Sequence, residues 1–197
     1  MYAYIKGQLE EKSNGFVVIE AFGVGYKVFM SNTAIGRLGE LHSNVKVYTY
    51  YQVREDNISL YGFNTKEELR MFELLISVSG IGSKSAINML SNIEASSFAI
   101  AVVSNDIKKI SSIKGIGNKT AQRLVLELKD KLKAEQELTK LEEVKEVVGE
   151  DEISSDAADA LQILGYTRKD IETALKKIDT SNLSTEEIIK GALKFLS

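Results

Sequence analysis

Two ten-residue stretches of this 197-residue chain share six of their ten residues at the same positions. Residues 77–86 read "SVSGIGSKSA" and residues 112–121 read "SIKGIGNKTA", so Gly-Ile-Gly, a lysine and an alanine recur at the same spacing. Glycine permits positive φ and places no side chain between the backbone and a ligand. The free N–H groups at the start of a helix attract anions. The repeat therefore predicts two binding sites for phosphate groups.

Each copy supplies a similar set of polar groups. We predict that each Gly-Ile-Gly backbone faces a phosphate, that a lysine adds a charge-assisted contact, and that a hydroxyl donates to it. The predicted phosphate-binding residues of the first copy are Gly80, Ile81, Gly82, Lys84 and Ser85. Those of the second copy are Gly115, Ile116, Gly117, Lys119, Thr120 and, about one turn further on, Arg123.

Three other interpretations compete with a phosphate site. A Rossmann loop also contains Gly-x-Gly, but it follows a strand, whereas the residues before Gly80 and Gly115 have a helical pattern. A Walker A loop needs G-x-x-x-x-G-K-[ST], which the sequence lacks. Two ordinary tight turns, rich in glycine only for packing, are the remaining alternative. The agreement between two copies in the same basic segment favours phosphate binding over this alternative.

The elements that position these residues can be read from periodicity. Residues 1–63 are rich in β-branched and aromatic residues with Gly, Asn and Ser turns, which predicts an OB-like five-stranded β-barrel. Tyr48 and Tyr50 lie in this segment, and barrel packing or a subunit contact is favoured over base stacking. Residues 64–132 predict an all-α domain in which short helices alternate with the two hairpins, starting from a capping box of Thr65 and Glu68.

The remainder of the chain divides into a linker and a small helical module. Residues 133–153 are dominated by Glu and Lys, which predicts an acidic flexible linker, helical at its start. Its Leu138, Leu141, Val144 and Val148 also fit an amphipathic helix. Residues 154–197 predict three helices, with caps at Ser155, Thr167 and Ser184 and a helix end at Gly165. The fold class is therefore α+β, in several domains.

Composition excludes several classes of function. The chain has no cysteine and no proline, and its single histidine is His42, so disulfides, cysteine-ligated metals and histidine triads are excluded. No signal peptide or membrane span is evident, so we expect a cytoplasmic protein. The formal net charge is -3, but residues 64–130, which hold the repeat, carry nine basic and seven acidic side chains.

Together these motifs resemble a known family. The two hairpins are similar to helix-hairpin-helix motifs, which hold a duplex backbone without reading base sequence. With "REDNISLYGF" at residues 54–63 and a three-helix tail similar to ubiquitin-associated modules, the whole chain resembles the RuvA family of Holliday-junction-binding proteins. Ser83 stands where the family often has proline, a departure expected to matter little. Asn118 replaces a common basic residue and is expected to weaken one phosphate contact.

The resemblance implies partners and roles. It implies a homotetramer, single or paired, that binds a four-way DNA junction and recruits the hexameric RuvB motor for branch migration in recombination and repair. The RuvC resolvase is a further partner in this picture. ATP and Mg²⁺ are used by the motor, so the chain is expected to have no catalytic site, metal or cofactor of its own. It also implies a surface for RuvB at Leu161, Leu164, Tyr166 and Leu193, although these positions also fit a core.

The family's acidic pin matches Glu55 and Asp56, with Arg54 beside them to attract a phosphate at the junction centre. A carboxylate about 4 Å from a phosphate is repelled by roughly 4 kcal/mol at an effective dielectric near 20. We therefore expect the pin to disfavour linear duplex at the centre while strands that turn into the arms are tolerated.

Three other functions stay open from the sequence. The first is a generic duplex-binding module, which would bind linear and four-way DNA equally. The second is a protein adaptor that acts through the C-terminal helices. The third is a nuclease in which Glu55 and Asp56 hold Mg²⁺, although two carboxylates on one turn make a poor metal site.

Overall fold

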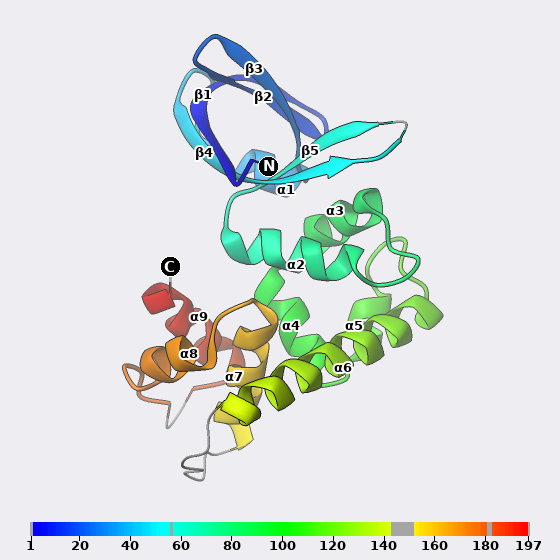
Figure 1. Ribbon diagram of the computed structural model, residues 1–197, viewed down its shortest axis with the longest axis vertical. Helices are drawn as coiled ribbons and strands as arrows, with labels where there is room; N and C mark the ends of the chain where they lie inside the picture. Colours follow the sequence, from blue (N-terminus) through cyan, green and yellow to red (C-terminus); the bar gives the residue numbers. More distant parts are fainter. Residues whose placement is uncertain (1, 56, 143–151, 181–182, 197) are drawn as a thin grey trace. The chain divides into compact units, whose positions relative to one another are not determined.

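The computed structural model describes residues 2–55, 57–142, 152–180 and 183–196 (Figure 1). By packing, the chain forms two compact units, Met1–Ile76 with Gly82–Asn92, and Ser77–Ile81 with Ile93–Ser197. The division falls inside the first Gly-Ile-Gly hairpin. All the described strands belong to the first unit, which confirms the predicted change from β to α structure along the chain.

The first unit contains a closed five-stranded barrel in the order β1-β2-β3-β5-β4. Its strands are β1 (Tyr4–Ser13), β2 (Phe16–Ala21), β3 (Val24–Phe29), β4 (Asn44–Val53) and β5 (Ile58–Phe63). All neighbouring strands are antiparallel except β3 and β5, which meet in parallel at Phe29 and Tyr61. A short helix, α1 (Asn32–Gly36), connects β3 to β4. The predicted OB-like barrel is confirmed.

Strand alternation and one glycine explain how the barrel closes. On β4, Val45, Val47 and Thr49 are buried, as the period of two predicts. β1 pairs with β4 up to Gln8 and with β2 from Gln8 onward. At Gly7, just before this change of partner, a Cβ atom would overlap the carbonyl oxygen of Glu20, so only glycine fits.

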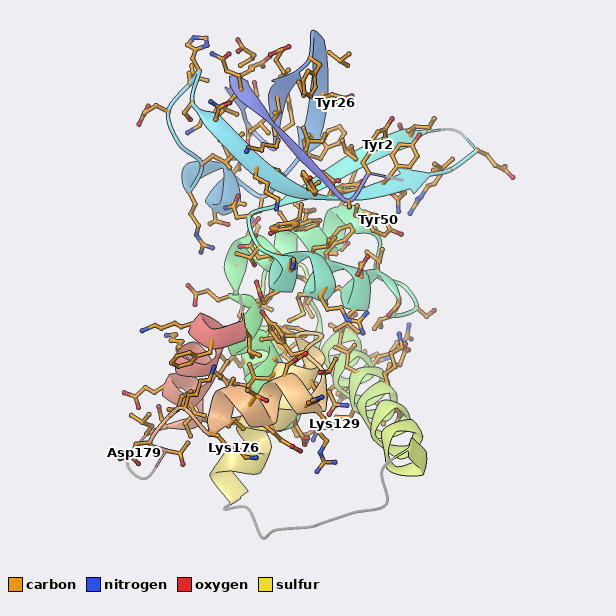
Figure 2. The ribbon with its side chains drawn as sticks, turned by 60° about the vertical axis from the view of Figure 1, so that its left-hand side comes forward. Tyr2, Tyr26, Tyr50, Lys129, Lys176 and Asp179 are labelled. Atoms are coloured by element: carbon orange, nitrogen blue, oxygen red, sulfur yellow. The ribbon has the colours of Figure 1, made fainter. Side chains whose placement is uncertain are left out.

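An aromatic cluster attaches a helix to the barrel within the first unit. Phe72 of α2 (Lys66–Ile76) has its ring centroid 5.3 Å from Tyr50, 5.2 Å from Tyr61 and 4.9 Å from Phe63. Tyr50 lies on β4 beside α2 (Figure 2). Tyr50 therefore packs against α2, and the expectation that it does not stack on bases stays a prediction.

Helices make up most of the remaining structure. The first unit adds α3 (Ser83–Asn92), and the second contains α4 (Ala95–Val103), α5 (Ile107–Ser111) and α6 (Asn118–Glu142). α6 extends ten residues past the predicted domain boundary at 132, so the start of the predicted linker is helical. Leu138 and Leu141 lie on this extension, whereas Val144 and Val148 fall outside the described residues.

The C-terminal module has the three predicted helices, α7 (Glu152–Ile163), α8 (Arg168–Leu175) and α9 (Thr185–Leu196). Within the second unit they pack on one another, and α7 and α9 also pack on α4. The cap at Thr167 is confirmed, because its hydroxyl accepts from the Asp170 N–H. The cap at Ser155 is wrong, because α7 already begins at Glu152. Gly165, with φ +92°, follows the end of α7 as predicted.

The start of α9 is a reciprocal capping box. The Ser184 hydroxyl and N–H both donate to Glu187 Oε2, at 2.7 Å and 2.9 Å. These hydrogen bonds lower the pKa of Glu187 below its ordinary value, the hydroxyl bond more than the backbone bond. The capping box predicted at this position is therefore confirmed.

Candidate nucleic-acid interface

The two Gly-Ile-Gly turns have the same backbone geometry. Gly80 and Gly115 have φ of +87° and +90°, the left-handed region that glycine adopts without strain. In the first turn the Ile81 N–H donates to the Val78 carbonyl at 3.1 Å. In the second turn Ile116 donates to Ile113 at 3.0 Å. The repeated letters therefore encode a repeated three-dimensional turn.

The two isoleucines anchor these turns. Their side chains are only 6% and 7% exposed at Ile81 and Ile116, and their N–H groups are used inside the turn. The helix after each turn begins with N–H groups that have no partner in the helix. The backbone donors available to an anion are therefore those that follow the isoleucines, at the starts of α3 and α6.

The second glycine of each turn has no structural need to be glycine. Neither Gly82 nor Gly117 adopts a left-handed backbone. Among the described residues, no atom lies within 4 Å of a Cβ built at either position. Each carbonyl accepts the first bond of its helix, from Ala86 at 3.0 Å or Ala121 at 2.9 Å. Asp, Asn or Ser is at least as good at such a cap, so the open space in front of these glycines points to a ligand.

The predicted polar side chains surround these helix starts. Lys84, Ser85 and Lys119 are exposed, and Thr120 is half-buried. Within the described part of the chain, neither lysine forms a hydrogen bond or an ion pair. Each ammonium group is therefore available to a ligand anion on the side where its helix begins.

Arg123 has a protein partner that the sequence did not indicate. Its Nη1 donates to the carbonyl oxygen of Ser79 at 3.1 Å, and both residues belong to the second unit. The guanidinium of α6 therefore contacts the first turn, 44 positions earlier in the chain.

Ser83 also has a partner, within the first unit. Its side chain is buried, with the residue 4% exposed, and its hydroxyl donates to Gln52 Oε1 on β4 at 3.0 Å. Ser83 therefore ties the start of α3 to the barrel strand β4. Asn118, the equivalent residue of the second turn, is exposed.

The predicted acidic pin lies where β4 and β5 extend beyond the barrel as a two-stranded arm (Figure 1). The Arg54 N–H donates to the Asn57 carbonyl at 2.9 Å. Arg54 and Glu55 are exposed, and Asp56 lies outside the described residues. The paired residues Val53 and Ile58 are each 62% exposed, an apolar pair beside the acidic tip that sequence reasoning missed. Their exposure cannot be read from sequence, because alternation alone predicts burial.

The predicted partner-binding residues of the C-terminal module are not equivalent. Leu161 and Leu164 are 0% and 3% exposed, so they belong to the core of the second unit, whereas Tyr166 and Leu193 are half-buried. Tyr166 lines an open cleft of about 260 Å³ together with Phe195, which is 51% exposed and which sequence reasoning missed. The open surface of the module therefore includes Tyr166 and Phe195 but not the two buried leucines.

Two observations concern site classes other than DNA binding. Among the described residues, no three His, Cys, Asp or Glu side chains are grouped as they would be in a metal site. In the same residues no single helix is long and apolar enough to cross a membrane, although the consecutive α3 and α4 together reach that length and composition.

An OB-like barrel with an acidic arm, followed by tandem helix-hairpin-helix motifs, defines a non-catalytic DNA-binding protein, and sequence comparison agrees. Residues 1–62 match the RuvA N-terminal domain, residues 72–130 match the SAM-like helix-hairpin-helix tandem, and residues 152–197 match the RuvA C-terminal domain. The chain belongs to the RuvA family.

Three relatives align with this chain over its whole length. The Holliday junction branch migration complex subunit RuvA of Acetivibrio thermocellus is 48% identical, over 100% of this chain and 99% of that protein. The proteins of the same name from Ruminiclostridium cellulolyticum and Lachnospira eligens are 46% and 42% identical. Both alignments cover 100% of this chain. They cover 100% of the Ruminiclostridium cellulolyticum protein and 99% of the Lachnospira eligens protein.

Proposed function

We propose that this chain binds four-way DNA junctions as the non-catalytic subunit of a branch migration complex, with RuvB as the ATP-driven motor. The observation that carries this proposal is the open space in front of Gly82 and Gly117. The protein's own backbone and packing accept a side chain at both positions. A glycine there serves a ligand that comes close to the backbone, and a phosphate oxygen matches the N–H groups that follow.

The phosphate contacts are shared between backbone and side chains. In each turn the N–H groups at the helix start hold one phosphate, and Lys84 or Lys119 adds a charge-assisted contact. Ser85 and Thr120 supply hydroxyl donors. Arg123 belongs to the same predicted set, and its Nη1 also donates to the Ser79 carbonyl. No base-reading group is part of this set, so binding follows DNA shape and not sequence.

Selectivity for a junction comes from the arm. Glu55 and Asp56 place two carboxylates at the centre of a tetramer, where they repel the phosphates of a continuous duplex. Arg54 attracts a phosphate of the exchanging strands beside these carboxylates. The cleft at Tyr166 and the half-buried Leu193 provide the contact with the motor. The tetramer and its pairing with a second tetramer are part of this proposal and follow from the family resemblance.

A gel-shift titration with matched four-way and linear DNA tests this function, with light scattering to count subunits. We expect the chain to prefer the junction by about tenfold or more, and the double variant Glu55→Gln with Asp56→Asn to lose most of this preference while it retains duplex binding. Equal affinity of the wild-type chain for both DNAs would favour a generic duplex-binding module. A double variant with unchanged preference would refute the repulsion mechanism.

A further inference from the structure

Helix α6 carries two cationic side chains that end on the loop of the first hairpin. Arg123 donates to the Ser79 carbonyl at 3.1 Å, and Lys131 Nζ donates to the Ser77 hydroxyl. All four residues lie in the second compact unit. Arg123 and Lys131 are eight residues apart, which is about 12 Å along a helix. Their side chains start from separate turns of α6 but end on acceptors that are only two residues apart.

The contact with Arg123 is close to the left-handed turn. Gly80 has φ +87°, and a Cβ built there would lie 3.4 Å from Arg123 Nη1. The guanidinium therefore lies against the Gly80 backbone and also donates to the Ser79 carbonyl. A planar guanidinium with several fixed donors holds a carbonyl in one orientation better than an ammonium group does. The turn is therefore held by Arg123 as well as by the hydrogen bond from the Ile81 N–H to the Val78 carbonyl.

We infer that Arg123 and Lys131 form a clamp, which holds the loop Ser77–Ile81 of the first hairpin at a fixed position relative to the second turn. The second turn leads directly into α6, so a loop fixed to α6 is also fixed to that turn. Two linked sites bind one duplex more tightly when their spacing matches the spacing of its phosphates. This role rests on the proposed function, and it makes Arg123 a positioning residue and not a phosphate ligand.

The clamp can be tested without DNA, by amide hydrogen exchange of the full-length protein measured by NMR. The readout is the Ile81 amide, which closes the first turn, and the internal reference is the equivalent Ile116 amide. We expect Arg123→Met to accelerate exchange at Ile81 by about three- to tenfold, and Lys131→Met to do so by less, with Ile116 unchanged within about twofold. Lys119→Met removes the same charge near the start of α6 and should leave both amides unchanged.

A DNA titration separates positioning from direct phosphate contact. Arg123→Met should lower junction affinity by about five- to tenfold at every salt concentration, with the slope of log affinity against log salt unchanged. Arg123→Lys, which keeps one donor and the charge, should recover part of the loss.

Unchanged exchange at Ile81 in both variants would overturn the clamp. A salt slope that falls by roughly 0.9 in Arg123→Met would make Arg123 a phosphate ligand and overturn its positioning role. If the wild-type chain binds no DNA, the proposed function fails, while the exchange result still decides whether the clamp exists.

Discussion

The two hairpins have nearly the same sequence and the same backbone, but they are attached to the protein differently. In the first, Ser83 donates to Gln52 on the barrel strand β4, and the Ser79 carbonyl accepts from Arg123. In the second, the equivalent of Ser83 is the exposed Asn118. The comparison teaches that glycine spacing specifies the turn, whereas residues outside the shared letters, such as Ser83 and Arg123, specify what holds it.

This difference has a functional consequence. In the first hairpin Ser83 ties the start of α3 to the barrel strand β4, so we expect a change there to affect stability as well as binding. The second hairpin presents Asn118 and Lys119 to solvent, so a change in it reports more directly on DNA contact. Variants made in matched pairs at equivalent positions can therefore test whether the two turns contribute equally to DNA binding and to stability.

The largest effect is expected from Gly82→Asp and Gly117→Asp. Asp is a preferred helix cap and a Cβ built at either position meets no described atom within 4 Å, so the free energy of unfolding should stay within about 0.5 kcal/mol of wild type or rise. The new carboxylate would occupy the phosphate position, and junction affinity should fall by about tenfold or more. Thermal unfolding and gel-shift titration measure the two quantities.

Thr65→Asp is the matched control, because Thr65 accepts from the Glu68 N–H at the start of α2 and lies outside both Gly-Ile-Gly repeats in the sequence. It adds the same charge at a helix cap and should change junction affinity by less than about twofold. If Gly117→Asp binds DNA as tightly as this control, the second turn holds no phosphate.

A smaller effect is expected for the lysines. Lys84→Ala and Lys119→Ala should each reduce the slope of log affinity against log salt by about 0.9, because each removes one phosphate contact. Equal reductions would show that the two turns bind equivalently despite their different attachments. A slope that stays at the wild-type value in either variant would remove that lysine from the interface.

The smallest effect should distinguish the attachments themselves. Ser83→Ala removes a buried hydrogen bond and should lower the free energy of unfolding by about 1 kcal/mol, whereas Asn118→Ala should change it by less than about 0.5 kcal/mol. Urea unfolding measures both. In a Gln52→Ala background the cost of Ser83→Ala should shrink, and a cost that stays the same would assign the effect to the start of α3 alone.

Features that depend on neighbouring residues were predictable from sequence. The caps at Thr65, Thr167 and Ser184 were predicted correctly because a cap joins residues three positions apart. The Ser155 cap was wrong because α7 already begins at Glu152. The residue type alone does not distinguish a serine inside a helix from a serine that caps its start. The phosphate-contact residues and the pin residues remain predictions that the DNA experiments must decide.

The sequence by itself determined the barrel, the two left-handed glycine turns and the helical module, because strand alternation, helix caps and positive φ all act over a few residues. Only the tertiary structure decided that Arg123 reaches Ser79, 44 positions away, and that Ser83 reaches Gln52, 31 positions away. It also decided that Leu161 and Leu164 are buried while Phe195 is exposed. A long polar side chain can reach many hydrogen-bond acceptors. Only the packing of elements that are distant in the sequence decides which acceptor lies close to it.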